Sequence, residues 1–129
     1  MPSAPPESAA PSSMAVSSYI ERSLHRRKQR HFHRQYLRKQ ERWLAAFDRA
    51  LPRIAGEHTL SELQQRVLRE EVRAHWAHRA SLEIARRLGD ITEPEREAGE
   101  ESARATLART LFALLDDEAA QALYEDLAW

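Results

Sequence analysis

The long helix that dominates this protein is predicted by residues 18–54, which read SYIERSLHRRKQRHFHRQYLRKQERWLAAFDRALPRI. Apolar residues in the second half recur at intervals of three, four and seven, the spacing of one helical face. They are Phe32, Tyr36, Trp43, Phe47, Ala50 and Ile54, with Leu37, Leu44 and Leu51 alongside. The first half has only Ile20 and Leu24 as aliphatic anchors, so we expect it to project into water or onto a partner. From Tyr19 to Leu51 such a helix would be about 50 Å long.

The ends of the helices are predicted from capping and turn residues. Three Ser/Thr-x-x-Glu capping boxes mark helix starts, at Ser18–Glu21, Thr59–Glu62 and Thr92–Glu95. We expect Pro52 with Gly56 to close the first helix, Gly89 with Asp90 to close the second, and Asp116 with Asp117 to cap a short fourth. No segment alternates apolar and polar residues over the length of a strand.

Three further helices follow, over residues 60–88, 93–115 and 118–127. The expected apolar side of the second carries Leu60, Leu63, Val67, Ala74, Ala77, Ile84 and Leu88. The densest apolar cluster lies at the end of the third, with Leu107, Leu111, Phe112, Leu114 and Leu115, and the last helix carries Ala120, Leu123, Tyr124 and Leu127. The prediction is an all-α, antiparallel, small helical bundle that oligomerises, most simply as a dimer, to cover its long helix.

The chain divides into three parts by composition. Residues 1–17 hold four of the six prolines and almost no large apolar group, so we predict a disordered Pro/Ser-rich tail. Residues 18–54 form the long basic helix, and residues 59–129 form a helical bundle with an acidic C-terminal half. The chain lacks cysteine, a secretory signal and any apolar run of about 18 residues, so we expect a cytoplasmic protein with no membrane span.

The sequence gives little support for catalysis or for metal binding. The three glycines are isolated, which excludes a glycine-rich phosphate loop, and no serine–histidine arrangement has a recognisable context. Glu71, His75 and His78 share a helical face and are ligand types that zinc or iron accepts. Three ligands on one helix seldom close a tetrahedron, so we predict a polar face beside Trp76. We expect no enzyme, no cofactor and no metal.

The net charge of zero hides a strong separation of charge. Residues 19–53 hold eleven Lys and Arg against three Asp and Glu, a net +8, whereas residues 90–129 carry a net −8. An arginine stands at every fourth position and further basic residues broaden the row. The candidate binding residues are Arg22, Arg26, Arg27, Arg30, Arg34, Arg38 and Arg42.

Three interpretations of this arginine ridge stay open. It suits an acidic protein groove, and with Phe32 and Tyr36 interleaved it also suits nucleic-acid phosphates. It could instead be a solvated face, or be docked on the acidic half of its own chain. No helix-turn-helix context is present, so we expect no sequence-specific DNA reading.

The chain ends on Trp129, its last residue. Chain ends usually fray, so a terminal tryptophan is either tucked back into the bundle or offered as an anchor to a partner.

Taken together, this layout resembles the carboxysome-positioning adaptors, the maintenance of carboxysome distribution protein B family. The shared features are the Pro/Ser-rich start, the basic helical segment, the helical middle and the acidic end with its terminal Trp129, although the middle is less glutamine-rich. The resemblance implies a bacterial adaptor, with coiled-coil character, that self-associates, rides on a microcompartment shell and stimulates a ParA-type ATPase on the nucleoid. Trp129 resembles the tryptophan that those proteins keep at or near the C-terminus.

The function we expect is therefore a non-enzymatic, self-associating adaptor whose basic helix docks on an acidic protein partner. The alternative is a nucleic-acid-binding accessory protein without sequence preference, which would use the same ridge.

Overall fold

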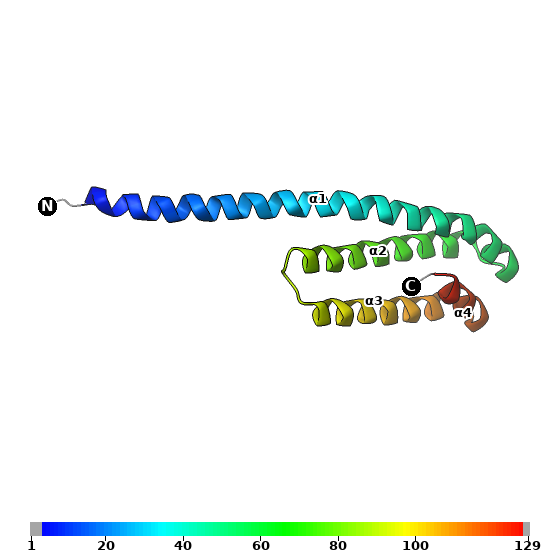
Figure 1. The fold of residues 1–129 in the computed structure, drawn as a ribbon. Coiled ribbons are helices and arrows are strands. Elements are labelled where there is room, and N and C mark those ends of the chain that lie inside the picture. Colours follow the sequence, from blue (N-terminus) through cyan, green and yellow to red (C-terminus); the bar gives the residue numbers. More distant parts are fainter. Residues whose placement is uncertain (1–3, 128–129) are drawn as a thin grey trace.

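Four helices make up the described part of the chain. The computed structural model describes the backbone of residues 4–127 and the side chains of residues 15–127. The helices are α1 (Ala4–His58), α2 (Glu62–Arg87), α3 (Glu93–Leu114) and α4 (Asp117–Asp126), and residues 4–127 contain no strand. The predicted all-α fold is confirmed: Figure 1 shows a small bundle of antiparallel helices beyond which α1 extends at one end.

The start of α1 lies inside the segment for which the sequence predicts disorder. The helix begins at Ala4 and includes Pro11, which removes one of its hydrogen bonds. Residues 15–22 are all exposed. A helical segment without tertiary packing has little to stabilise it in water. Disorder of residues 1–17 in solution therefore stays a prediction.

The other end of α1 corrects the sequence analysis. Pro52 does not close the helix, which continues through Gly56 to His58. Proline cannot donate to the Asp48 carbonyl, but Leu51 and Ile54 on either side of it are buried and hold the chain in place. In Figure 1 the last turns of α1 bend towards the bundle, as a helix interrupted by proline does.

The caps agree with the sequence at three places and differ at two. The capping box predicted at Ser18 and Glu21 opens no helix, because α1 runs from Ala4 through both residues. Thr92 and Glu95 form the predicted capping box, Asp116 caps α4 through the Ala119 amide, and Gly89 follows α2 with a φ of 80°.

The box that opens α2 is Ser61 with Gln64 rather than Thr59 with Glu62. Because α1 runs on to His58, Thr59 becomes the residue that turns the chain out of α1, with a φ of 55°.

The helices are arranged so that α2 separates α1 from α3. Helix α2 packs on both of them, α4 packs on α3 and on α1, and no contact joins α1 to α3 in the described residues. Figure 1 shows the same order, with α4 filling the end where α1 turns into α2. The basic helix and the acidic helix therefore lie on opposite sides of α2.

The apolar core lies at the α4 end of the bundle. All four helices contribute to it, and Trp43 of α1 stacks on Trp76 of α2 with ring centroids 4.2 Å apart. Its buried members are Phe47, Leu51, Ile54, Leu68, Val72, Trp76, Leu107, Leu111, Leu115, Ala119, Ala120, Leu123 and Leu127. A smaller cluster of Tyr36, Ala80 and Ile84 joins α1 to α2 nearer the other end. These contacts confirm the apolar stripe predicted for α1 except at Leu37, which is 44% exposed.

The predicted apolar side of α2 is largely wrong. Of its seven members only Ile84 is buried, whereas Leu63 is 64% exposed and Ala74 and Ala77 are exposed as well. The buried residues of α2 are Leu68, Val72, His75, Trp76, Ala80 and Ile84. Since α2 has partners on two sides, its buried surface includes the polar His75 and the large Trp76, which a single aliphatic stripe leaves out.

Candidate interaction surface

The first part of α1 is a single helix that no other element covers. We call residues 15–30 the arm. Each of them is exposed except Ser23, which is half-buried. Figure 1 shows the arm reaching past the connection between α2 and α3. The prediction that the first half of the long helix projects away from the bundle is confirmed.

The arginine ridge runs along the arm and onto the packed part of α1. Arg22, Arg26, Arg27, Arg30, Arg34, Arg38 and Arg42 are all exposed. None of the seven has an ion pair with another described residue, although the chain carries as many acidic as basic residues. The ridge is therefore a row of unneutralised positive charge.

The acidic C-terminal half does not neutralise the ridge. Two ion pairs join residues 18–54 to that half within the described chain: His25 Nε2 lies 3.8 Å from the Asp90 carboxylate, and Arg53 Nη2 lies 2.7 Å from Asp126. Both involve residues outside the ridge. In this fold the ridge does not dock on the acidic half of its own chain, because α2 lies between α1 and α3.

A cavity lies beside the middle of the ridge, between α1 and α2. Its volume is about 410 Å³. Arg30, His33 and Arg34 line it from α1, Ile84 lines it from α2, and Leu88 and Asp90 line it from the segment after α2. A site with two guanidinium groups and one carboxylate beside aliphatic carbon suits a partner that presents a carboxylate or phosphate next to an apolar group.

Trp129, the other predicted binding residue, lies outside the described residues. Leu127, two positions earlier, is buried against the core, so the chain stays with the bundle up to that point. Whether the tryptophan is tucked in or is an anchor stays a prediction.

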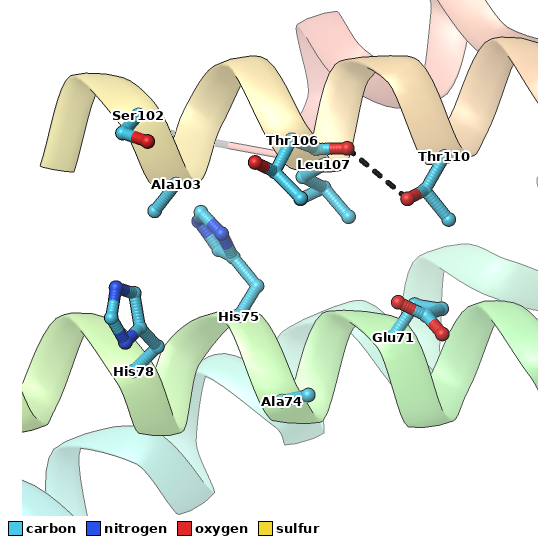
Figure 2. Close-up of a pocket in the computed structure, with 9 residues that line it drawn as sticks. All are labelled: Glu71, Ala74, His75, His78, Ser102, Ala103, Thr106, Leu107 and Thr110. Carbon is cyan, nitrogen blue, oxygen red and sulfur yellow. Dashed lines mark hydrogen bonds between the residues drawn. The ribbon is translucent and has the colours of Figure 1, made fainter. Parts of the chain in front are cut away.

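The three candidate metal ligands lie along one pocket, as Figure 2 shows. The pocket has a volume of about 260 Å³ and lies between α2 and α3. His75 reaches from α2 towards Ala103 of α3 and is buried, whereas Glu71 and His78 are exposed. In the part of the chain with described side chains, no three His, Cys, Asp or Glu residues are grouped closely enough to hold a metal ion.

The environment of His75 keeps it neutral. Burial is the main reason that its pKa falls to about 4, and the positive charges near it, those of Arg79 first, lower the pKa further. The ring also lies edge-on to Trp76, with centroids 5.3 Å apart. His75 is therefore a packed interface residue that resists protonation.

The sequence analysis missed an ionic cluster at the end of the bundle opposite α4. Arg96 of α3 is its hub: Nη1 lies 3.0 Å from Glu83 of α2 and 2.7 Å from Glu100, and the guanidinium also pairs with Glu93. Arg79 approaches Glu100 at 3.9 Å. Hydrogen bonds to Glu93 and then to Glu100 raise the pKa of Arg96 above its usual value, while burial lowers the pKa of Arg79.

A signal for this cluster is present in the sequence. Arg79, Glu83 and Arg86 alternate in sign at helical spacing on α2, and Glu93, Arg96 and Glu100 do so with opposite signs on α3. Charges three and four residues apart share a face, so two such complementary runs indicate facing helices.

Comparisons with known proteins identify no relative. No family model matches the chain, and no curated protein or solved structure shows significant similarity to it. Among the described helices, none has a stretch long and apolar enough to cross a membrane.

Proposed function

We propose that this chain is a non-enzymatic, self-associating adaptor whose arginine ridge docks on an acidic surface of a protein partner, with the cytoplasm as its expected compartment. The observation that carries the proposal is the state of the ridge: its seven arginines are exposed and have no ion pair in the described chain. Because α1 does not contact α3, the acidic residues of the same molecule leave this charge available.

The ridge has features of a protein-binding surface. Guanidinium groups form paired hydrogen bonds with carboxylates and stack on aromatic rings, and arginine is enriched at the centres of interfaces. Exposed apolar groups accompany the ridge, with Leu24 and Leu37 each about half exposed. A partner with carboxylates around an apolar groove would match both kinds of group.

The resemblance to carboxysome-positioning adaptors suggests which partners to test first. They are a ParA-type ATPase and the proteins of a microcompartment shell, with Trp129 as a second anchor. Microcompartment genes or a ParA-type ATPase gene beside the gene for this chain would favour these partners.

The test is affinity capture from the native host, with one arm treated with nuclease. The ridge variant carries Arg26→Gln, Arg30→Gln, Arg34→Gln and Arg38→Gln. The matched control removes four exposed arginines outside the ridge, as Arg49→Gln, Arg66→Gln, Arg73→Gln and Arg109→Gln. We expect the wild type and the control to retain the same protein partner after nuclease treatment, and the ridge variant to lose it. Equal retention by all three proteins would refute docking through the ridge.

Trp129→Ala tests the second anchor in the same capture. Loss of the partner with unchanged helicity and melting would place the tryptophan at the interface. Loss of helicity would place it in the core.

The second candidate function is nucleic-acid binding without sequence preference, which the row of unpaired arginines also favours. Each phosphate contact releases counterions, so the logarithm of affinity falls by about 0.9 per contact with the logarithm of salt concentration. The ridge winds around α1, so we expect about three or four contacts and a slope near −3 on duplex DNA. Tight DNA binding at about 0.15 M salt that is unaffected by Trp129→Ala would favour this candidate over the adaptor.

A further inference from the structure

The arm carries an apolar stripe that nothing covers. Val16, Ile20 and Leu24 stand four residues apart, Tyr19 stands three residues after Val16, and each of the four is between 50% and 61% exposed. Residues at such intervals share one face of a helix. Four large apolar groups together on a projecting helix mark a surface that binds something.

This stripe cannot be covered by the molecule's own α2. Ile20 precedes the buried Tyr36 by 16 residues. At about 100° per residue the two side chains point about 160° apart, so the stripe lies on the side of α1 away from α2. A partner from outside the molecule must cover it.

A second uncovered surface lies along the outer side of α3. Ala98, Ala105 and Phe112 stand seven residues apart and are exposed, Phe112 by 41%. Glu97 and Glu101 flank this row; both are exposed and have no ion pair with another described residue. The opposite side of α3 packs on α2 and α4 through Ala103, Leu107 and Leu111.

We propose that the arm of one molecule packs along the outer side of α3 of a second copy. The apolar stripe would cover Ala98, Ala105 and Phe112, while Arg26, Arg27 and Arg30, which lie on or beside the stripe at about 100° per residue, would face Glu97 and Glu101. The lengths agree, since an arm of 16 residues spans about 24 Å and α3, with 22 residues, about 33 Å. Two arms do not pair with each other, because their arginines repel.

The two surfaces dictate how copies assemble. The stripe and the outer side of α3 lie on different helices, which α2 separates. Each molecule therefore binds another copy through its stripe and is bound by another copy on the outer side of its α3. Such contacts build rings or open filaments when they run head-to-tail, and they close a dimer when two copies exchange arms reciprocally. The inference deepens, and rests on, the self-association in the proposed function. Arg34, Arg38 and Arg42 would remain for the outside partner.

The test is the mass of the purified, nuclease-treated protein by analytical ultracentrifugation at low and high salt. For the wild type at low salt we expect a mass that rises with concentration to two or more chains of 14.9 kDa, and dissociation near 1 M salt, where charges are screened. Monomers at every concentration tested, or assembly that disappears with nuclease, would each overturn the inference.

Two charge-reversal variants make the test specific. The arm variant carries Arg26→Glu, Arg27→Glu and Arg30→Glu, and the α3 variant carries Glu97→Arg and Glu101→Arg. Each alone should need at least about tenfold more protein to assemble, which corresponds to about 1.4 kcal/mol. An equal mixture should regain assembly, because each variant complements the other. Folded variants that assemble like the wild type, or a mixture that stays apart, would overturn the inference.

The α3 variant also separates this inference from partner docking, because it leaves the ridge unchanged. If it fails to assemble but still captures the host partner, both proposals stand. If the wild type assembles as expected and captures no protein, the self-association stands and the partner docking fails. Unchanged circular dichroism and melting would show that both variants fold, as their substituted residues are exposed.

Discussion

The three glycines of this chain lie in three different environments. Gly89 has a φ of 80° after α2, where its amide donates to the Arg86 carbonyl and the Asp90 amide donates to Ala85. Gly56 lies within α1, and a Cβ added there would meet nothing within 4 Å. A Cβ on Gly99 would come within 2.9 Å of the Leu82 side chain.

The same substitution should therefore have opposite effects at two of them. Gly89→Ala should lower the free energy of unfolding by about 1 kcal/mol, because a Cβ disfavours positive φ. Gly56→Ala should raise it by about 0.5–1 kcal/mol through helix propensity. Urea unfolding of both variants measures this difference. Equal signs would show that the end of α2 or of α1 differs from the described geometry.

His75 should make stability depend on pH in a defined window. Its pKa is about 4 in the folded state, against about 6.5 for an ordinary histidine. Between these values the unfolded chain binds a proton that the folded protein does not. The free energy of unfolding should therefore fall by up to about 1.4 kcal/mol per pH unit as the pH drops through this window, and be unaffected by His75 above it.

Urea unfolding between pH 7.5 and pH 4.5 tests this expectation. His75→Gln should flatten the dependence relative to the wild type, whereas His31→Gln, at an exposed position on α1 that does not act on His75, should leave it unchanged. An identical pH dependence in the wild type and His75→Gln would assign acid sensitivity to the carboxylates instead.

At the scale of the elements, α2 and α3 are joined by two different kinds of contact. Near α4 the contact is apolar, through Val72, Leu107 and Leu111, and at the other end it is ionic, through Arg96 and its partners. A polar interface costs desolvation, and breaking it from one side leaves charge without a partner.

Arg96→Met should lower the free energy of unfolding by more than a change at an ordinary surface position does, because Glu83 and Glu100 lose the guanidinium with which both of them pair. Adding Glu100→Met should recover part of that loss, a coupling that a double-mutant cycle measures. Arg109→Met, at an exposed position of the same helix, is the control. A loss below about 0.5 kcal/mol for Arg96→Met, as at an ordinary surface site, would contradict the role given to the cluster.

The limits of reading these elements from sequence have physical reasons. The stripe of α1 and the Thr92 cap were predicted correctly, because local periodicity and local hydrogen bonds determine them. Two overlapping motifs, at Thr59 and at Ser61, could open α2, and the choice depends on α1 continuing past Pro52. Burial of Leu51 and Ile54 decides that continuation, and burial is a tertiary property.

The candidate surface was also predicted only in part, for the same reason: its local features follow from the sequence, and its tertiary features do not. That Arg26 and its neighbours are exposed follows from the local sequence, because residues 25–31 contain no apolar side chain. These arginines do not contact the acidic half because α2 lies between α1 and α3. That order of helices cannot be inferred from the charge or the periodicity of the sequence. The contribution of His75 to the buried side of α2 was missed for a related reason, because it requires knowing that α3 covers that side.

At the scale of the whole molecule, the chain has no net charge, but its positive and negative residues lie in separate parts of the fold. Residues 19–53 carry +8 and residues 90–129 carry −8, yet two ion pairs join residues 18–54 to the acidic half in the described structure. Separated surface charge contributes little to stability but strongly to association with other molecules. The docking of a protein partner on the ridge and the packing of the arm on α3 of a second copy both follow from this separation of charge.

The most direct measurement of the central claim, that the ridge is not used by the fold, is the melting temperature of the ridge variant at low protein concentration and about 0.15 M salt. Glutamine keeps helix propensity close to that of arginine, and the four replaced side chains are exposed. We predict a melting temperature equal to that of the wild type or slightly higher, since repulsion within α1 is relieved. A fall of more than about 5 °C, about 1 kcal/mol or more for a domain of this size, would show that the ridge pairs with the chain's own acidic half and would contradict the proposed function.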